Sequence, residues 1–117
     1  MLNQVVLVGR VVYEIEVQKN DSGKKYAMLT LAVPRSFKNM EGTYDTDFLK
    51  CVLWDSIAEN TGLYCHKGDI VGVKGRLQSR NIEKNKKKET IMEVIAEKVT
   101  FLTSKGQDST DKKEEKA

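Results

Sequence analysis

The order of the strand-like segments, which one helical segment interrupts, constrains the fold most. Five runs are rich in the β-branched, aromatic and other apolar residues that strands favour. They cover residues 5–13, 26–33, 47–54, 70–77 and 90–102. Ser56 precedes a helical segment over about residues 57–65, and Glu59 three residues later completes a capping-box pattern. The chain therefore predicts three strands, a helix and two further strands.

This order of elements predicts an all-β fold. A five-stranded Greek-key barrel with one short helix between its third and fourth strands is the OB-fold. We expect residues 1–102 to form this single domain. Residues 103–117 contain one apolar residue, the terminal alanine, and their four lysines cancel four acidic side chains. Such a segment cannot bury enough apolar surface to offset its ordering entropy, so we expect a disordered polar tail.

Proline and glycine positions predict where the strands bend and end. Pro34 is expected to end the second strand, because proline has no N–H group to donate to a β-ladder. Residues 35–45 then form a polar loop, and residues 80–89 form a second polar segment between the last two strands. Gly9, inside the first run, predicts a bulge or a sharp coil of the kind that a closing barrel needs.

The net charge of +3 resides entirely in the second polar segment. Residues 80–89 carry five basic side chains against two acidic ones, and the rest of the chain therefore sums to zero. A concentrated positive field suits an anionic polymer such as nucleic acid. A solvated loop that is basic by chance is an alternative of equal weight for a lysine run alone.

The third run has two chemically different faces, because alternate side chains of a strand point to opposite sides. One face carries Leu49, Cys51 and Leu53, which we assign to the core. The opposite face carries two aromatic rings, a lysine and a valine: Phe48, Lys50, Val52 and Trp54. Lysine is seldom fully buried, so this face is expected to meet solvent. Exposed rings beside a cation suit a nucleic-acid single strand; packing under a loop or in a subunit contact is the alternative.

Further cations accompany this face. Phe37 lies between Arg35 and Lys38 in the first polar loop, where a ring could stack on a base while the cations screen phosphates. A hydrophobic anchor for that loop is the alternative. Lys74 and Arg76 share one face of the fourth run, and a polar outer face is the commoner meaning of such charges.

Several other classes of protein are disfavoured. No apolar run is long enough to span a bilayer, and the N-terminus lacks the pattern of a signal peptide. Cys51 and Cys65 are too few for a disulfide framework, and reduced thiols in a cytoplasmic protein are the simpler interpretation. With His66 they do not give the paired spacing of a zinc site. The sequence holds no phosphate-loop pattern and no catalytic constellation, so we expect no cofactor, no metal and no enzymatic activity.

An ordered series of short motifs resembles the bacterial and phage single-stranded DNA-binding protein family. The matching stretches are residues 2–10, 31–33, 46–54, 58–60, 67–69, 71–80, 93–96 and 99–102. The series covers about residues 1–102, in order. The resemblance implies an OB-fold that assembles as a homotetramer and wraps single-stranded DNA.

The family's base-stacking positions fall on Phe37, Phe48, Trp54 and Ile82. Ile82 has no π-face, although the family often has an aromatic ring at this position. The basic segment is therefore expected to bind mainly through Lys86, Lys87 and Lys88. Family members commonly end in an acidic tip with a terminal proline and phenylalanine, whereas this sequence ends Lys113-Glu114-Glu115-Lys116-Ala117. Recruitment of replication enzymes through an acidic tail is therefore not expected.

These observations predict a non-enzymatic protein that binds single-stranded DNA with little sequence preference and protects it during replication, recombination and repair. Phosphate contacts are expected from Arg35, Lys38, Lys50, Lys74, Arg76, Arg80, Lys86, Lys87 and Lys88. The expected location is the cytoplasm, in association with the nucleoid. The alternative is an OB-fold protein-interaction or replication-restart module with secondary DNA binding, over which the aromatic face and the basic segment favour direct binding.

Overall fold

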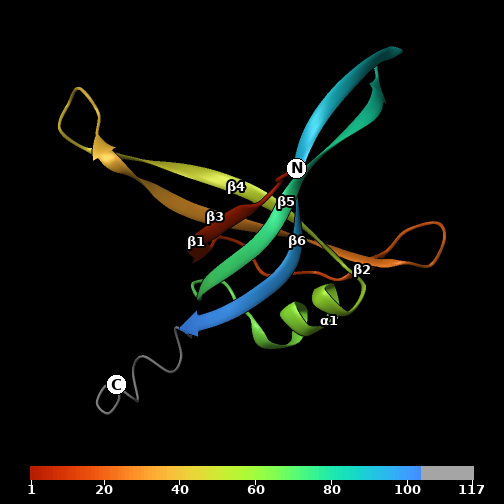
Figure 1. The fold of residues 1–117 in the computed structure, drawn as a ribbon. Coiled ribbons are helices and arrows are strands. Elements are labelled where there is room, and N and C mark those ends of the chain that lie inside the picture. The colour runs from red at the N-terminus through yellow and green to blue at the C-terminus, as the bar shows by residue number, and fades with distance from the viewer. Residues whose placement is uncertain (104–117) are drawn as a thin grey trace.

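The computed structural model describes residues 1–103 as six strands and one helix (Figure 1). In chain order these are β1 (Val5–Val11), β2 (Gln18–Lys19), β3 (Lys25–Lys38), β4 (Tyr44–Trp54), α1 (Asp55–Tyr64), β5 (Ile70–Lys84) and β6 (Lys87–Thr103). Figure 1 shows a central barrel with α1 beneath it and two long hairpins projecting from it. We name their outer parts the β3–β4 arm (residues 34–47) and the β5–β6 arm (residues 78–93).

The barrel closes because its first strand pairs with two others. The sheet order is β1-β5-β6-β4-β3-β2, and β1 also pairs with β3 through Arg10 opposite Ala32 and Val11 opposite Leu31. All pairs are antiparallel except β4 with β6. Five strands thus enclose the core, while the two-residue β2 extends the sheet beyond β3. The expected OB-fold, with its helix between the third and fourth barrel strands, is confirmed.

Alternate residues of the strands fill the barrel interior. Leu29, Leu31, Leu53 and Val71 are completely buried, as the period of two predicts for inward-facing positions. Helix α1 contributes Ala58 and Thr61, 0% and 1% exposed, which close one end of the barrel. This packed interior fixes the strands whose outer faces carry the candidate site.

Two glycines permit close approaches between strands. A Cβ atom at Gly9 would lie 2.8 Å from the backbone oxygen of Ala32 on β3, so any side chain there would hold the closing strands apart. Of the two features predicted at Gly9, the bulge is wrong, because β1 keeps its register with β5 through that position, and the sharp coil stays a prediction. The β5–β6 ladder has two register shifts, one between Ile70 and Val71 and one between Lys74 and Gly75, where a Cβ on Gly75 would overlap the backbone of Ile95.

Both expected polar loops are β-structure. Pro34 does not end the second barrel strand: it lies opposite Thr46, and β3 continues to Lys38 after a register shift. Such an irregularity accommodates a residue that lacks an N–H group. Likewise, residues 80–89 belong almost entirely to the paired strands β5 and β6, with a tight turn at Asn85 and Lys86. The arms are therefore ordered ladders.

Helix α1 begins earlier than expected. Its first residue is Asp55, so Ser56 lies inside the helix, and the predicted capping box is wrong. The N-cap residue, Trp54, has an extended backbone and makes no side-chain capping bond, because β4 runs directly into the helix. The expected polar tail lies almost wholly outside the described residues, so the boundary at residue 102 stays a prediction.

Candidate nucleic-acid interface

The outer face of β4 carries exposed rings and a cation. Phe48 is 64% exposed, Lys50 is exposed and Trp54 is half-buried. Val52 was expected to meet solvent on the same face, but it is only 5% exposed. It is covered because Met28 of β3 and Ile95 of β6 lie opposite it in the two adjoining ladders. The face is thus a set of rings and one cation around an apolar centre.

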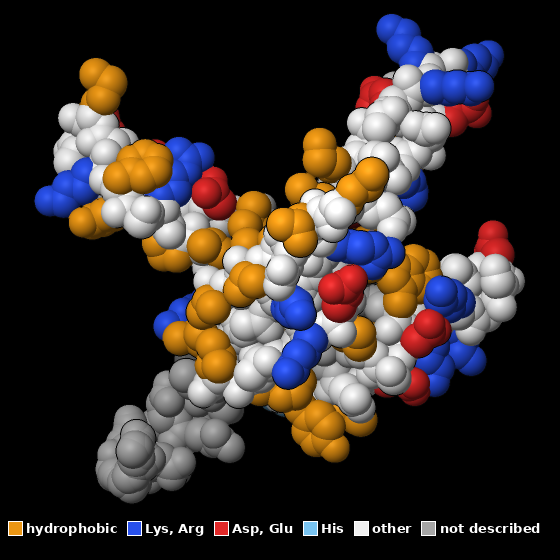
Figure 2. All heavy atoms as spheres, in the orientation of Figure 1, with side chains coloured by type: hydrophobic (Ala, Val, Ile, Leu, Met, Phe, Trp, Pro, Cys, Tyr) orange, Lys and Arg blue, Asp and Glu red, His pale blue; other side chains and the backbone are white. Residues whose placement is uncertain are grey.

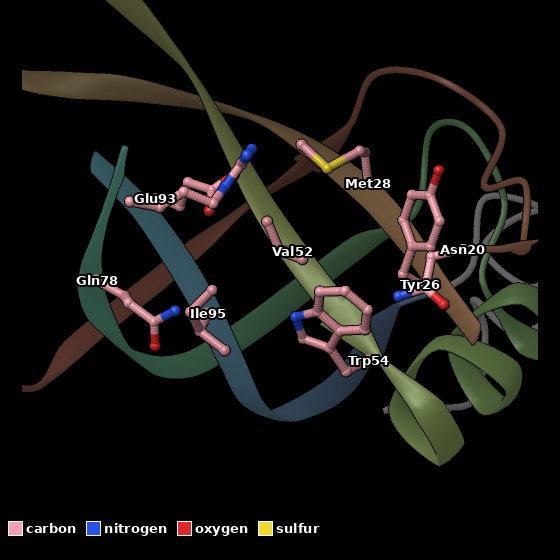
Figure 3. Close-up of a pocket in the computed structure, with 9 residues that line it drawn as sticks. Asn20, Tyr26, Met28, Val52, Trp54, Gln78, Glu93 and Ile95 are labelled. Carbon is pink, nitrogen blue, oxygen red and sulfur yellow. The ribbon is translucent and has the colours of Figure 1, made fainter. Parts of the chain in front are cut away.

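That apolar centre is the floor of a surface pocket of about 360 Å³ (Figure 3). Its lining comes from the β2–β3 turn and from β3, β4, β5 and β6: Asn20, Tyr26, Met28, Val52, Trp54, Gln78, Arg80, Glu93 and Ile95. Figure 3 shows the Tyr26 and Trp54 rings on one side of Val52, and Gln78 and Glu93 on the other. The pocket therefore joins the β4 face to the base of the β5–β6 arm.

Tyr26 is a ring of this face that the sequence pattern did not assign. It lies opposite Trp54 in the β3–β4 ladder, with ring centroids 5.6 Å apart and ring planes inclined at 45°. Its hydroxyl donates a 2.9 Å hydrogen bond to Oε1 of Gln18. Lys24 places its ammonium 4.8 Å from the centroid of the Trp54 ring. The cross-strand register is the signal that would have identified Tyr26.

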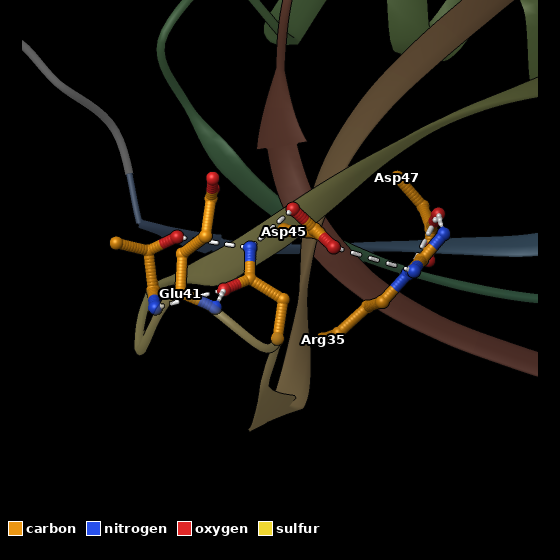
Figure 4. Close-up of polar contacts among 6 residues, drawn as sticks. Arg35, Glu41, Asp45 and Asp47 are labelled. Atoms are coloured by element: carbon orange, nitrogen blue, oxygen red, sulfur yellow. Dashed lines mark hydrogen bonds and ion pairs between the residues drawn. The ribbon is translucent and has the colours of Figure 1, made fainter.

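The β3–β4 arm has a tip held by Asn39. Figure 4 shows this network of polar contacts, with Glu41 and Asp45 labelled. The Asn39 carboxamide oxygen accepts bonds from the backbone N–H groups of Glu41 and Thr43, while its amide donates to Asp45. Phe37 on this arm is 64% exposed, and Met40 at the turn is fully exposed. The arm therefore holds apolar side chains in solvent on a hydrogen-bonded frame.

The cations of the β3–β4 arm have partners. Arg35 donates three hydrogen bonds of 2.9–3.2 Å to the Asp47 carboxylate, and it lies 3.6 Å from Asp45. These bonds lower the pKa of Asp47 and raise the pKa of Arg35. Lys38 lies 6.0 Å from the centroid of the Tyr44 ring. Asp45 and Asp47 are both residues of β4, and both face Arg35.

The β5–β6 arm combines paired arginines at its base with lysines at its tip. Arg80 donates two 3.0 Å hydrogen bonds to the Glu93 carboxylate, and these bonds lower the pKa of Glu93. Arg76 lies 3.6 Å from Glu97 and bonds to Gln78. At the tip, the exposed lysines are Lys84, Lys86, Lys87 and Lys88. Figure 2 shows blue side chains gathered at the end of this arm. Within residues 1–103, none of these four makes a recorded ion pair.

Two remaining predicted residues lie apart from the pocket lining. Ile82 is half-buried on the β5–β6 arm, between the pocket and the lysine tip. Lys74 is exposed below the irregularity at Gly75, opposite Val6 of β1. The fold thus gathers Trp54 and Arg80 at one pocket, spreads Phe37, Phe48 and Ile82 around it, and places Lys74 beyond the arm.

Other kinds of site find little support in the described part of the chain. Burial raises the pKa values of both free thiols, Cys51 and Cys65, to about 11, so neither is an activated nucleophile at neutral pH. Residues 1–103 contain no group of three His, Cys, Asp or Glu side chains that could hold a metal ion. No helix in that range is long and apolar enough to cross a membrane.

Comparison with known proteins agrees with this arrangement. The chain is 44% identical over 106 residues to single-stranded DNA-binding protein B of Bacillus subtilis, covering 90% of this chain and 94% of that protein. It is 45% identical to single-stranded DNA-binding protein 3 of Listeria innocua, of which it spans only 66%. The solved Plasmodium falciparum SSB complex with ssDNA has a TM-score of 0.74 and 30% identity, over 87% of this chain and 96% of that one.

A family model provides the most direct classification. The model described as the single-strand binding protein family matches residues 2–102, which include every barrel strand and both arms. The matched range agrees with the span over which the motifs of the sequence follow the family in order. This chain belongs to the single-strand binding protein family.

Proposed function

We propose that this chain binds single-stranded DNA with little dependence on base sequence. The observation that carries the proposal is the outer face of β4, where Phe48, Lys50 and Trp54 occupy alternate positions. Every base has a π-face, so rings along a strand stack with any sequence, and cations between them attract phosphates. The family match and the similarity to a complex containing single-stranded DNA support the proposal.

The bases are proposed to follow the apolar side chains from one arm to the other. Phe37 on the β3–β4 arm, Phe48 and Trp54 on β4, and Ile82 on the β5–β6 arm supply the contacts. Each stacked base contributes on the order of 1–3 kcal/mol. Ile82 has no π-face and can offer a base only apolar contact, so its contribution is expected to be the smallest of the four.

The phosphates are proposed to meet two kinds of cation. The lysines, which make no ion pair within residues 1–103, give the attraction: Lys38, Lys50, Lys74, Lys86, Lys87 and Lys88. Arg35, Arg76 and Arg80 already face carboxylates, so each would have to share its guanidinium with a phosphate. We therefore assign most of the electrostatic attraction to the lysines, and the tip of the β5–β6 arm carries three of them.

Fluorescence titration of Trp54, the sole tryptophan, tests the proposal directly. Oligo-dT should quench its emission strongly, and a duplex of the same length should not. Binding should weaken steeply as salt rises, because neutralised phosphates release counterions. The salt slope, which is the change in the logarithm of the binding constant per unit change in the logarithm of the salt concentration, is about −0.7 per phosphate contacted on a single strand. Equal binding of the duplex, or a flat salt response, would contradict the proposal.

We also infer that the protein acts as a homo-oligomer, the homotetramer that the family resemblance implies. Only Arg10 and Val11 of β1 pair with β3, so the preceding part of β1 has an open edge. Val6 and Val8 on this strand are 67% and 53% exposed, although they are apolar. An open edge with exposed apolar side chains is a surface that proteins usually cover. Light scattering should give the mass of four chains, and Val8→Lys should lower it.

The cellular role follows from the proposed binding. A protein that covers single strands without sequence preference would protect them during replication, recombination and repair, and binding alone suffices for this, with no catalytic step. The free, buried thiols of Cys51 and Cys65 suit the reducing cytoplasm, where the nucleoid lies. The prediction that no acidic tail recruits replication enzymes concerns residues outside the described part of the chain.

A further inference from the structure

The pocket beside Trp54 is a hollow lined by residues of four strands, whereas stacking alone needs only an exposed ring. We propose that this pocket is a subsite that binds one nucleobase of the bound strand, and that Tyr26 is a stacking residue of the subsite. The inference rests on the proposed function, because its ligand is a base of single-stranded DNA. A pocket of about 360 Å³ lies within the usual range for small-molecule sites, about 300–1,000 Å³.

The two rings of the pocket form a corner. With centroids 5.6 Å apart and planes inclined at 45°, Tyr26 and Trp54 leave no parallel slot between them. A base laid flat on one ring therefore meets the other ring at its edge, and both stacked and edge-to-face contacts are favourable for aromatic groups. Lys24 lies over the Trp54 ring but does not line the pocket, so it leaves the pocket side of that ring open.

The wall that carries Tyr26 is organised before any ligand arrives. The Asn20 carboxamide oxygen accepts bonds from the N–H groups of Ser22 and Lys24, which fixes the β2–β3 turn. The Lys24 ammonium lies 3.7 Å from the Asp55 carboxylate at the start of α1. Since little conformational freedom is left to lose, a base entering the corner does not have to order this wall.

The floor and the far rim suit a base as well. Met28, Val52 and Ile95 give an apolar floor for the ring. On the rim, the Glu93 carboxylate is engaged by Arg80 in two bonds, so its charge is balanced. The Gln78 carboxamide oxygen accepts a bond from Arg76, which leaves its amide N–H groups to donate to a carbonyl oxygen or ring nitrogen of a base.

The test compares two ligands and three variants by fluorescence anisotropy. The ligands are labelled oligo-dT and an abasic oligomer of equal length, which keeps the phosphates but has no bases. Tyr26→Leu should weaken oligo-dT binding roughly five- to hundredfold, and it should leave abasic binding unchanged. Tyr26→Phe keeps the ring and should bind as the wild type does. Tyr64→Leu removes an equally polar ring, 66% exposed on α1, and is the matched control.

The outcomes separate the inference from the function beneath it. An equal loss on both ligands, or no loss on oligo-dT, overturns the subsite while the proposed function stands. Failure of the wild-type protein to bind oligo-dT overturns both. If Tyr26→Leu does not fold, the wild-type protein still gives an answer through photocrosslinking to 5-iodouracil-substituted oligo-dT. A crosslink at Tyr26 supports the subsite, and crosslinks confined to Phe37, Phe48 and Trp54 overturn it.

Discussion

The two arms resemble each other as long hairpins, but they carry charge in opposite ways. The β3–β4 arm (residues 34–47) has two basic and three acidic side chains, and its arginine faces two of the acids. The β5–β6 arm (residues 78–93) has five basic and three acidic side chains, with its free lysines collected at the tip. The first arm exposes Phe37 and Met40 instead.

This difference teaches that the two arms can contact a bound strand in two unlike ways. The free lysines of the β5–β6 arm attract any phosphate chain, and that attraction weakens with salt. The ring of Phe37 offers stacking, which needs bases and depends little on salt. If the comparison is right, changes in one arm should alter the salt dependence of binding, and changes in the other should alter affinity without altering that dependence.

The largest expected effect comes from the lysine tip. Replacing Lys86, Lys87 and Lys88 together by alanine removes up to three phosphate contacts, each worth about 0.7 in the salt slope. The slope should therefore become shallower by about 2, and affinity at 0.1 M salt should fall about hundredfold. Oligo-dT titrations at several salt concentrations measure both quantities. An unchanged slope would mean that these lysines do not meet phosphates.

The next effect concerns the ring of the other arm. Phe37→Ala should weaken oligo-dT binding by on the order of 1–3 kcal/mol, because one base loses its stacking partner. The salt slope should stay that of the wild type, since no charge changes. The same titrations at several salt concentrations check this, and Phe37→Tyr, which keeps a ring, serves as the control. A shallower slope for Phe37→Ala would break the division between the two arms.

A smaller effect should follow from freeing the arginine of the β3–β4 arm. Asp47→Asn removes the carboxylate that receives three hydrogen bonds from Arg35. The guanidinium, left with only the more distant Asp45 carboxylate, should then add a phosphate contact, steepening the salt slope by about 0.7 and raising affinity a few-fold. The double variant Asp47→Asn with Arg35→Ala should cancel the gain. If Asp47→Asn alone leaves the slope unchanged, Arg35 lies away from the DNA backbone.

The barrel could be predicted from the sequence because its signals are local. Leu49, Cys51 and Leu53 alternate with a face that carries Lys50, and this period of two marks their side of the strand as the inward one. Cys51 and Leu53 are completely buried as expected, whereas Leu49, also assigned to the core, is only half-buried. The arms could not, because Pro34 and the lysine-rich residues 84–88 carry the composition of loops. Their ladders extend because each strand follows its partner outward from the barrel, and this pairing is a property of the fold rather than of either segment.

Some residues of the candidate site could likewise be predicted from local sequence, whereas others depend on the pairing of strands. Phe48, Lys50 and Trp54 lie on one strand, so their shared face follows from a period of two. Tyr26 joins them only through the β3–β4 register, and the ion pairs of Arg35 and Arg80 join residues 12 and 13 positions apart. The pattern within a single strand identifies the charged residues but not their partners on other strands. The sequence-based prediction therefore counted more arginines free to bind phosphate than the structure leaves.

The smallest effect tests how the two arms turn. The β3–β4 tip places Gly42 at φ 84°, whereas the β5–β6 tip places Asn85 and Lys86 at φ 52° and 65°. Positive φ at both central residues is the pattern of a type I′ hairpin turn, and glycine adopts it without steric cost. Lys86→Gly should therefore stabilise the β5–β6 arm by about 0.5–1 kcal/mol, raising the hydrogen-exchange protection of its amides roughly two- to fivefold. Lys86→Ala removes the same charge but keeps a Cβ atom, so it should give no gain. If Lys86→Gly and Lys86→Ala raise the protection equally, the gain comes from relief of repulsion between lysines and not from the backbone of the turn.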